Sequence, residues 1–150
     1  MTEPATQMSG NKRVTFISPY AEHTPAPDPA LLRDLIMNSG DEYWQAAAGD
    51  AALWFDEDDR ENGKRARLIF KEDEKLGFFL IYVDPENGDY FCPVVAIEND
   101  QRVMLEDPSG GEPLDIKLSN LLDKDTTWKV VEYFQQHGER LPNLTWQEWR

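Results

Sequence analysis

Carboxylates are the most abundant chemically active groups in this sequence. The chain has 29 aspartates and glutamates against 15 lysines and arginines in 150 residues, a formal net charge of -14. Two carboxylates can serve as general acid and general base when one of them is partly buried and its pKa is perturbed. With so many acids, most belong to a solvated surface. A small hydrolase that uses paired carboxylates is therefore one hypothesis, although no recognisable constellation supports it.

The common catalytic and metal-binding motifs are incomplete in this sequence. A calcium loop beginning at Asp58 would place Arg60 where an oxygen ligand is required. The histidines His23 and His137 are far apart, and the single Cys92 completes neither a zinc site nor a cysteine–histidine pair. There is also no glycine-rich phosphate loop and no Gly-x-Ser-x-Gly turn. We therefore expect a protein that is not an enzyme and has no metal or cofactor.

The acids are concentrated in two parts of the sequence. Residues 56–61 contain five acids and one arginine, and residues 84–112 contain eight acids and one base, which leaves the second segment with half of the formal net charge. Such a surface repels nucleic acid and anionic membranes and speeds association with basic proteins. We therefore expect a basic protein partner, and neither nucleic acid nor a membrane.

Several of these acids should lie on loops between neighbouring strands, where they would form a negative rim. Tyr82 and Trp54 lie close to these loops in sequence, and aromatic anchors hold a complex after charge has accelerated the encounter. The alternative is an acidic surface that serves only solubility. The residues that we expect to contact a partner are Asp56, Glu57, Asp58, Asp59, Glu61, Asp84, Glu86, Asp89, Tyr90, Glu106 and Asp107.

The apolar run from Leu76 to Asp84 is expected to be the central strand that positions these loops. Its aromatic and β-branched residues favour a strand buried on both faces. Strand-like segments flank it at residues 65–71 and 89–97, and Pro93 should place the second at a sheet edge or a bulge. Further strands are expected at residues 13–18, 51–55, 102–105 and 114–118. The sequence therefore predicts an α+β fold, an antiparallel meander of about five to seven strands with two main helices on one face.

Two amphipathic helices should cover that sheet. The first follows Asp28, a good N-cap, with Pro29 at its first position, and ends near Gly40. Residues 41–48 are expected to add a short helical turn. The buried face of the first helix should consist of Leu31, Leu32, Leu35 and Ile36. The second helix should be capped by Asp125 or Thr126, end at His137-Gly138, and bury Trp128, Val130, Val131 and Phe134.

The length of the chain fits one domain, since about 150 residues can bury roughly two-thirds of their unfolded surface. We expect residues 1–12 to be a flexible leader and residues 13–150 to form a single domain. Cys92 lies in an apolar segment and should be a buried free thiol, which fits a reducing compartment. The sequence shows no signal peptide and no apolar run of about 18 residues. We therefore predict a cytoplasmic protein.

The C-terminal segment from Val130 to Trp146 has a recognisable pattern. An amphipathic helix with an aromatic residue near its end runs into glycine, a basic residue and proline, and closes on tryptophan. This pattern resembles the closing motif of the first-numbered immunity protein family of bacterial polymorphic toxin systems, and the likeness extends loosely over residues 30–149. Leu141 departs from it, because the family more often has its basic residue directly before proline. The matching residues Phe134, Gly138, Pro142 and Trp146 form the structural motif.

Members of that family are small α+β cytosolic proteins that neutralise a cognate toxin domain, often a nuclease or a nucleic-acid deaminase. The resemblance therefore implies an immunity protein that binds its toxin one-to-one. It nominates no toxin-contacting residue, and the acidic rim is our charge-based prediction for the surface that would occlude the active site. The alternative hypothesis is an adaptor or chaperone that binds a basic secreted effector without inhibiting it.

Overall fold

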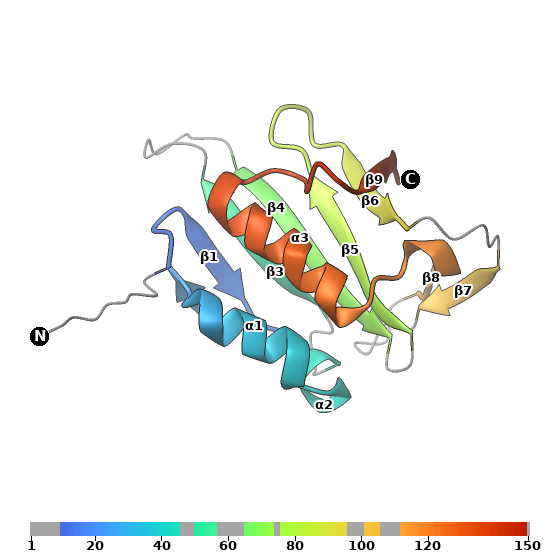
Figure 1. Cartoon of the computed structure of the whole chain (residues 1–150), viewed down its shortest axis with the longest axis horizontal. Helices are drawn as coiled ribbons and strands as arrows, with labels where there is room; N and C mark the ends of the chain where they lie inside the picture. The colour runs from blue at the N-terminus through green and yellow to red at the C-terminus, as the bar shows by residue number, and fades with distance from the viewer. Residues whose placement is uncertain are drawn as a thin grey trace, which may run out of the picture.

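The computed structural model describes residues 10–45, 50–56, 65–73, 76–95, 101–105 and 112–149. In these residues the helices form one layer over one face of a seven-stranded antiparallel sheet (Figure 1). The predicted α+β fold with a meander sheet is confirmed. Asn11, expected in the flexible leader, is held in place because its side-chain Nδ2 donates to the Gln135 carbonyl oxygen at 3.1 Å.

The large sheet has the strand order β2-β1-β3-β4-β5-β6-β9, with every neighbouring pair antiparallel. Strands β3 to β6 form the meander, and β5 lies inside it with six of its seven residues buried, as its composition predicted. Leu76, expected to begin β5, lies before it and is 42% exposed. The strands are β1 (Val14–Ile17), β2 (His23–Pro25), β3 (Ala51–Asp56), β4 (Arg65–Asp73), β5 (Gly77–Val83), β6 (Tyr90–Val94) and β9 (Thr145–Glu148).

Two further strands, β7 (Arg102–Leu105) and β8 (Leu114–Lys117), form a separate two-stranded sheet. Both were expected as strands, but they do not extend the meander. The ends of the large sheet are instead formed by β2 and β9, which were not predicted as strands. Both are three or four residues long, so neither carries a periodicity that could be recognised before its neighbour is known.

Strand β6 separates from β5 near Pro93. Its pairing with β5 is limited to residues Tyr90 and Phe91, whereas its pairing with β9 continues through Val94. The strand therefore has two neighbours and is not an edge strand of the sheet, but on its β5 side the pairing stops before Pro93, the residue for which an edge or a bulge was expected. The Trp149 N–H donates to the Tyr90 carbonyl, so the backbone groups of Tyr90 point toward β9. Backbone groups of successive strand residues point to opposite sides, so those of Pro93 point toward the β5 side. The strand is unpaired there, and the N–H that proline lacks is not needed.

Beside β6 from Pro93 onward, the 3-10 helix η1 (Leu118–Asn120) takes the place of β5 as the hydrogen-bonding neighbour. The Val95 N–H donates to the Ser119 carbonyl at 2.9 Å, and the buried Asn120 side chain donates to the Pro93 carbonyl at 3.1 Å. These bonds satisfy the groups that β6 exposes where it leaves β5. They also attach the segment that follows β8 to the large sheet.

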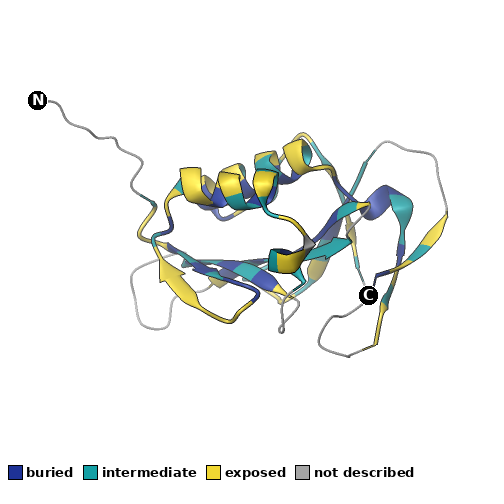
Figure 2. Cartoon of the chain, turned by 90° about the horizontal axis from the view of Figure 1, so that it is seen from below, coloured by how far each residue is buried: buried dark blue, intermediate teal, exposed yellow. Residues whose placement is uncertain are grey.

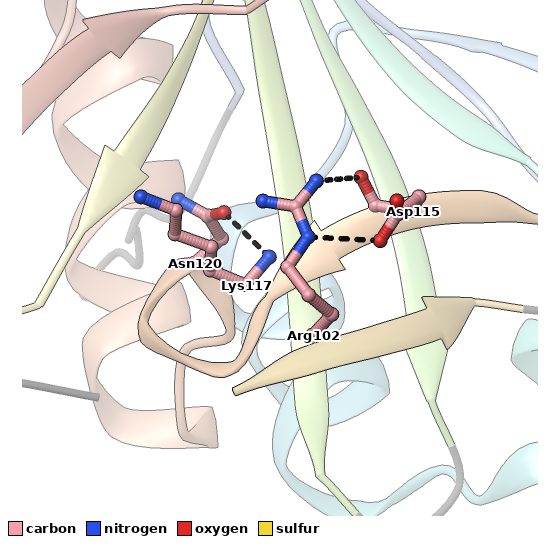
Figure 3. A network of polar contacts seen from close by, with 4 residues as sticks. All are labelled: Arg102, Asp115, Lys117 and Asn120. Carbon is pink, nitrogen blue, oxygen red and sulfur yellow. Dashed lines mark hydrogen bonds and ion pairs between the residues drawn. The ribbon is translucent and has the colours of Figure 1, made fainter. Parts of the chain in front are cut away.

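A polar network continues from η1 onto the small sheet (Figure 3). The Asn120 Oδ1 accepts a hydrogen bond from the Lys117 N–H at 3.0 Å. On the neighbouring strands the Arg102 Nε lies 3.0 Å from the Asp115 carboxylate, and both side chains are more than half exposed. This pair lies at the surface, so we assign it a positioning effect on β7 and β8 and little stability.

Three α-helices lie on the same side of the large sheet, namely α1 (Pro29–Asn38), α2 (Asp41–Trp44) and α3 (Lys124–His137). Asp28 caps α1 as predicted, since its carboxylate accepts from the Ala30 N–H at 2.9 Å. Of the expected apolar face, Leu32 and Ile36 are buried, but Leu31 is 50% exposed. Successive helix residues point about 100° apart, so Leu31 can point to solvent while Leu32 points to the sheet.

Helix α3 (Lys124–His137) is capped two residues before the first predicted cap. Its N-cap is Asp123, whose carboxylate accepts from the Thr126 N–H at 2.7 Å. Asp125 lies in the first turn instead, where its charge suits the helix dipole. The predicted C-cap is confirmed, because Gly138 adopts the left-handed conformation at φ 69°.

Side chains pack into two cores, one on each face of the sheet. The main core lies between the helices and the sheet and includes Phe70, Leu80 and Phe134. The second lies on the opposite face, the outer face, where the small sheet and Trp149 cover β5 and β6. Figure 2 shows the helices on one side of the sheet and the β7–β8 hairpin extending beyond the other. The buried free thiol of Cys92 belongs to this second core.

Candidate protein-binding surface

The meander brings described residues from both acidic segments to one end of the sheet. Strand β3 ends at Asp56, β5 is followed by Asp84, and β6 begins at Tyr90. These ends coincide because neighbouring strands are antiparallel, with Asp56 opposite Arg65 and Val83 opposite both Arg67 and Tyr90. Figure 1 shows the β5–β6 connection at the end of the sheet where β3 ends and β4 begins. We call Asp56, Asp84, Glu86, Asp89 and Tyr90 the acidic end.

The β5–β6 turn is held by its own polar groups. The Asp84 carboxylate accepts from the Glu86 N–H at 2.8 Å, and the Asn87 side-chain oxygen accepts from the Asp89 N–H at 3.1 Å. The Gly88 N–H donates to the Asp84 carbonyl at 2.8 Å. Aspartate and asparagine commonly close turns in this way. The turn therefore presents the exposed carboxylate of Glu86 in a defined position beside partly exposed Asp84 and Asp89.

The other carboxylate of the acidic end is partly neutralised within the chain. The Asp56 carboxylate lies 2.5 Å from the Arg65 Nε, and these side chains are 35% and 58% exposed. Glu57, Asp58, Asp59, Glu61, Glu106 and Asp107, also predicted contacts, lie outside the described residues. Most carboxylates of the described acidic end therefore lie in the β5–β6 turn, at Asp84, Glu86 and Asp89.

The C-terminal motif supports this end from the helix side. The buried Tyr82 hydroxyl donates to the Gly138 carbonyl at 3.2 Å, and the Arg140 guanidinium lies over Phe91 at 4.2 Å from the ring centre. The Trp146 indole N–H donates to the Leu141 carbonyl at 3.1 Å. Phe134 packs edge-on against Tyr82, and Pro142 lies in the turn between α3 and β9. These contacts fasten α3 and β9 to strands β5 and β6.

The aromatic residues suggested as anchors lie in different environments. Tyr90 is 37% exposed beside the turn. Tyr82 is 5% exposed and faces the helices, so it cannot contact a partner directly. Trp54 lies on the outer face, half-buried, with the Arg67 guanidinium 4.9 Å from its ring centre. Arg67 was not predicted as a site residue, although the alternation of Arg65, Arg67 and Ile69 along β4 signals a face that does not point into the main core.

The shifted pKa values lie elsewhere in the chain. Burial raises the pKa of the Cys92 thiol to about 11, and burial also raises the pKa of Tyr43. A backbone hydrogen bond from Thr126 lowers the pKa of Asp123. Among the described residues, no group of three or more histidine, cysteine or acidic side chains could hold a metal ion. The acidic end thus offers fixed charge and an exposed aromatic ring, a combination suited to binding a cationic surface.

No protein-family model matches this chain, and no curated protein matches it at a significant level. Within the part of the chain that the structure describes, no helix is long and apolar enough to span a membrane. The function proposed below therefore depends on the surface chemistry and on the C-terminal motif.

Proposed function

We propose that this chain is an immunity protein that binds a cognate toxin domain and occludes its active site. The toxin would be a basic nuclease or nucleic-acid deaminase, bound one-to-one in the cytoplasm. The observation that carries the proposal is the acidic end, where the meander brings Asp84, Glu86 and Asp89 together with exposed Tyr90. Enzymes that act on nucleic acid attract phosphates with basic residues, and carboxylates in fixed positions can compete for the same residues.

The net charge supports this mode of inhibition. A formal charge of -14 creates a long-range field that can raise association rates with a basic partner by about 10- to 1,000-fold. Fast capture is useful to an inhibitor that must bind before its target reaches its substrate. Because the Debye length falls from about 10 Å at 0.1 M salt to about 3 Å at 1 M, the association rate should fall steeply with salt.

The first experiment identifies the partner and measures its effect. The tagged chain is used to retain a partner from a lysate of the cells of origin, and the retained protein is then produced alone and together with this chain. We expect a single basic protein that stops growth alone and is neutralised in the complex. A retained protein that is harmless alone, or that stays active in the complex, would contradict the proposed function.

The second experiment tests the acidic end with matched variants. Glu86→Gln with Asp89→Asn removes two charges from the turn, while Asp34→Asn with Glu132→Gln removes two exposed charges from the helix layer. We expect the first pair to lower the association rate and to flatten its salt dependence, and the second pair to do so much less. If neutralising the β5–β6 turn and residues 56–61 together changes neither affinity nor salt response, the acidic end is not the contact surface.

An adaptor or chaperone that binds a basic secreted effector could use the same acidic end. Charge complementarity alone does not distinguish the two functions, because both require a basic partner. They differ in the activity of the complex, since an adaptor leaves the effector's active site open. Assaying the effector's activity at saturating concentrations of this chain separates them.

A further inference from the structure

The outer face of strands β1, β3 and β4 is apolar at its centre. Side chains on this face lie in two rows that cross the sheet in register. One row contains Ile17, Ala52, Ile69 and Ile81, and the next contains Thr15, Trp54, Arg67, Val83 and Tyr90. Ile17, Ala52, Trp54 and Ile69 are each partly exposed, unlike the fully buried residues that alternate with them.

Only one half of this face is covered within the described chain. The small sheet and Trp149 pack over Phe79, Ile81 and Val83 on β5, which form the second core. The helices lie on the opposite side (Figure 2). The half formed by β1, β3 and β4 has the same apolar character. Ile69 of β4 packs against the edge of the second core, whereas Ile17, Ala52 and Trp54 belong to neither core of the described chain.

Charged pairs border the apolar centre. Asp56 pairs with Arg65 at one end of β3 and β4, and Lys71 pairs with Asp50 at the other. An apolar centre inside a polar rim is the usual anatomy of a protein–protein interface. Tryptophan, arginine and tyrosine, which occupy the row at Trp54, are the residue types most enriched among binding hot spots.

Arg67 gives the centre of this face a positive charge. Its guanidinium stacks over Trp54 at 4.9 Å, with the Arg65 guanidinium also over that ring at 5.6 Å. Arg65 has a carboxylate partner, whereas among the described residues Arg67 has none. A planar guanidinium supported on an aromatic ring is well suited to bind a carboxylate through two hydrogen bonds.

We propose that the outer face of β1, β3 and β4 is a docking surface with Trp54 and Arg67 at its centre. Its occupant is a segment of the partner protein that places an apolar or aromatic side chain on Trp54 and a carboxylate on Arg67. This identification of the partner rests on the proposed function. The docking surface borders the acidic end at Asp56, which lies on the same face of β3 two residues beyond Trp54.

The two surfaces then have opposite charge and distinct tasks. The acidic end binds basic residues of the partner, while the docking surface requires an acid at one position. A partner must therefore present basic residues to the acidic end and an acid to Arg67, which fixes its orientation and disfavours proteins that are only basic. A second copy of this chain is a poor occupant, since each copy has a net charge of -14.

The docking surface can be tested without knowing the natural partner. The full chain is immobilised and used to select ligands from a displayed library of random peptides. We expect the enriched peptides to combine an aromatic or apolar residue with aspartate or glutamate. Their affinity should fall about 30-fold or more in Trp54→Ala, as for a binding hot spot. It should also fall in Arg67→Gln, which changes a partly exposed side chain and should not impair folding.

Matched controls are Trp128→Ala and Arg33→Gln, a partly exposed tryptophan and an exposed arginine on the helix layer. Circular dichroism verifies that each variant is folded. The proposal is overturned if no peptide is enriched, if the peptides lack acids, or if they bind Arg67→Gln as tightly as the unaltered chain. A dimer that sedimentation detects and that Arg67→Gln dissociates would show that a second copy is the occupant, which also overturns it.

The same variants separate this inference from the proposed function. If the captured toxin is neutralised equally well by the unaltered chain and by Arg67→Gln, the immunity function stands and the docking surface is wrong. If the selected peptides require Trp54 and Arg67 but the captured protein is harmless, the docking surface stands and the immunity function is wrong.

Discussion

Replacing Gly138 with alanine should destabilise the fold through two separable effects. Gly138 ends α3 at φ 69°, in the left-handed region. A Cβ built on it would lie 2.5 Å from Cδ1 of Phe55 and 2.7 Å from Cγ of the same ring. Phe55 is 6% exposed and packs edge-on against Phe134, so its ring has little room to move.

The magnitude follows from adding the two costs. The left-handed conformation costs a residue with a Cβ about 1–2 kcal/mol. Forcing a methyl group into a packed core costs typically about 1–3 kcal/mol more. We therefore expect Gly138→Ala to lower the free energy of unfolding by about 2–5 kcal/mol, a large part of the roughly 5–15 kcal/mol typical of a domain.

Alanine substitutions at two other glycines separate the backbone cost from the packing cost. Gly88 has φ 75° but nothing within 4 Å of a built Cβ, so Gly88→Ala measures the backbone cost alone. Gly40 has neither constraint, and Gly40→Ala should change stability by less than about 0.5 kcal/mol. Urea denaturation followed by circular dichroism gives the three values, with the slope m expected to stay constant.

The result that refutes this reasoning is a Gly138→Ala variant no less stable than Gly88→Ala. The contact between residue 138 and Phe55 would then contribute nothing. A second check is a double-mutant cycle with Phe55→Leu, because a smaller side chain relieves the overlap. We expect Gly138→Ala to cost less in that background, and equal costs would exclude the ring as the cause.

Two further predictions concern titrating groups. Burial raises the pKa of the Cys92 thiol from 9.0 to about 11, so between these pH values only the unfolded chain ionises at this position and stability falls as pH rises. Urea denaturation across this pH range should show that the free energy of unfolding falls by about 2–3 kcal/mol less in Cys92→Ala than in the unaltered chain. Equal slopes of the free energy of unfolding against pH in the two proteins would contradict this. Asp123→Ala should cost about 0.5–2 kcal/mol at pH 7 by removing the α3 cap. Because the pKa of Asp123 is lowered in the folded chain, this difference should shrink as the pH falls through that pKa, while Asp123→Asn should retain most of the cap at pH 7.

The local features of this fold could be predicted because each one depends on neighbouring residues. The apolar β5, the Asp28-Pro29 start of α1 and the Gly138 end of α3 all follow from residue type and spacing. The predicted cap of α3 was wrong because more than one nearby aspartate could cap the helix. Asp123 caps α3 in preference to Asp125 because the Phe78–Leu122 bridge fixes where the chain enters the helix.

The sheet order and the surfaces could not be predicted in the same way. Strands β2 and β9 form only because β1 and β6 provide their hydrogen-bonding partners, and the β7–β8 hairpin separates because η1 occupies the place beside β6. No periodicity encodes the register between strands, which depends on pairing across the chain.

The sequence by itself determined the charge of this protein, its apolar segments, the start of α1 and the end of α3, since these are properties of adjacent residues. Only the tertiary structure decided which acids share the acidic end, that Tyr82 is buried while Tyr90 is exposed, and that Trp54 and Arg67 lie side by side. A binding surface is assembled from strands that are distant in sequence. Its composition can therefore be counted in the sequence, but its arrangement follows from the strand register.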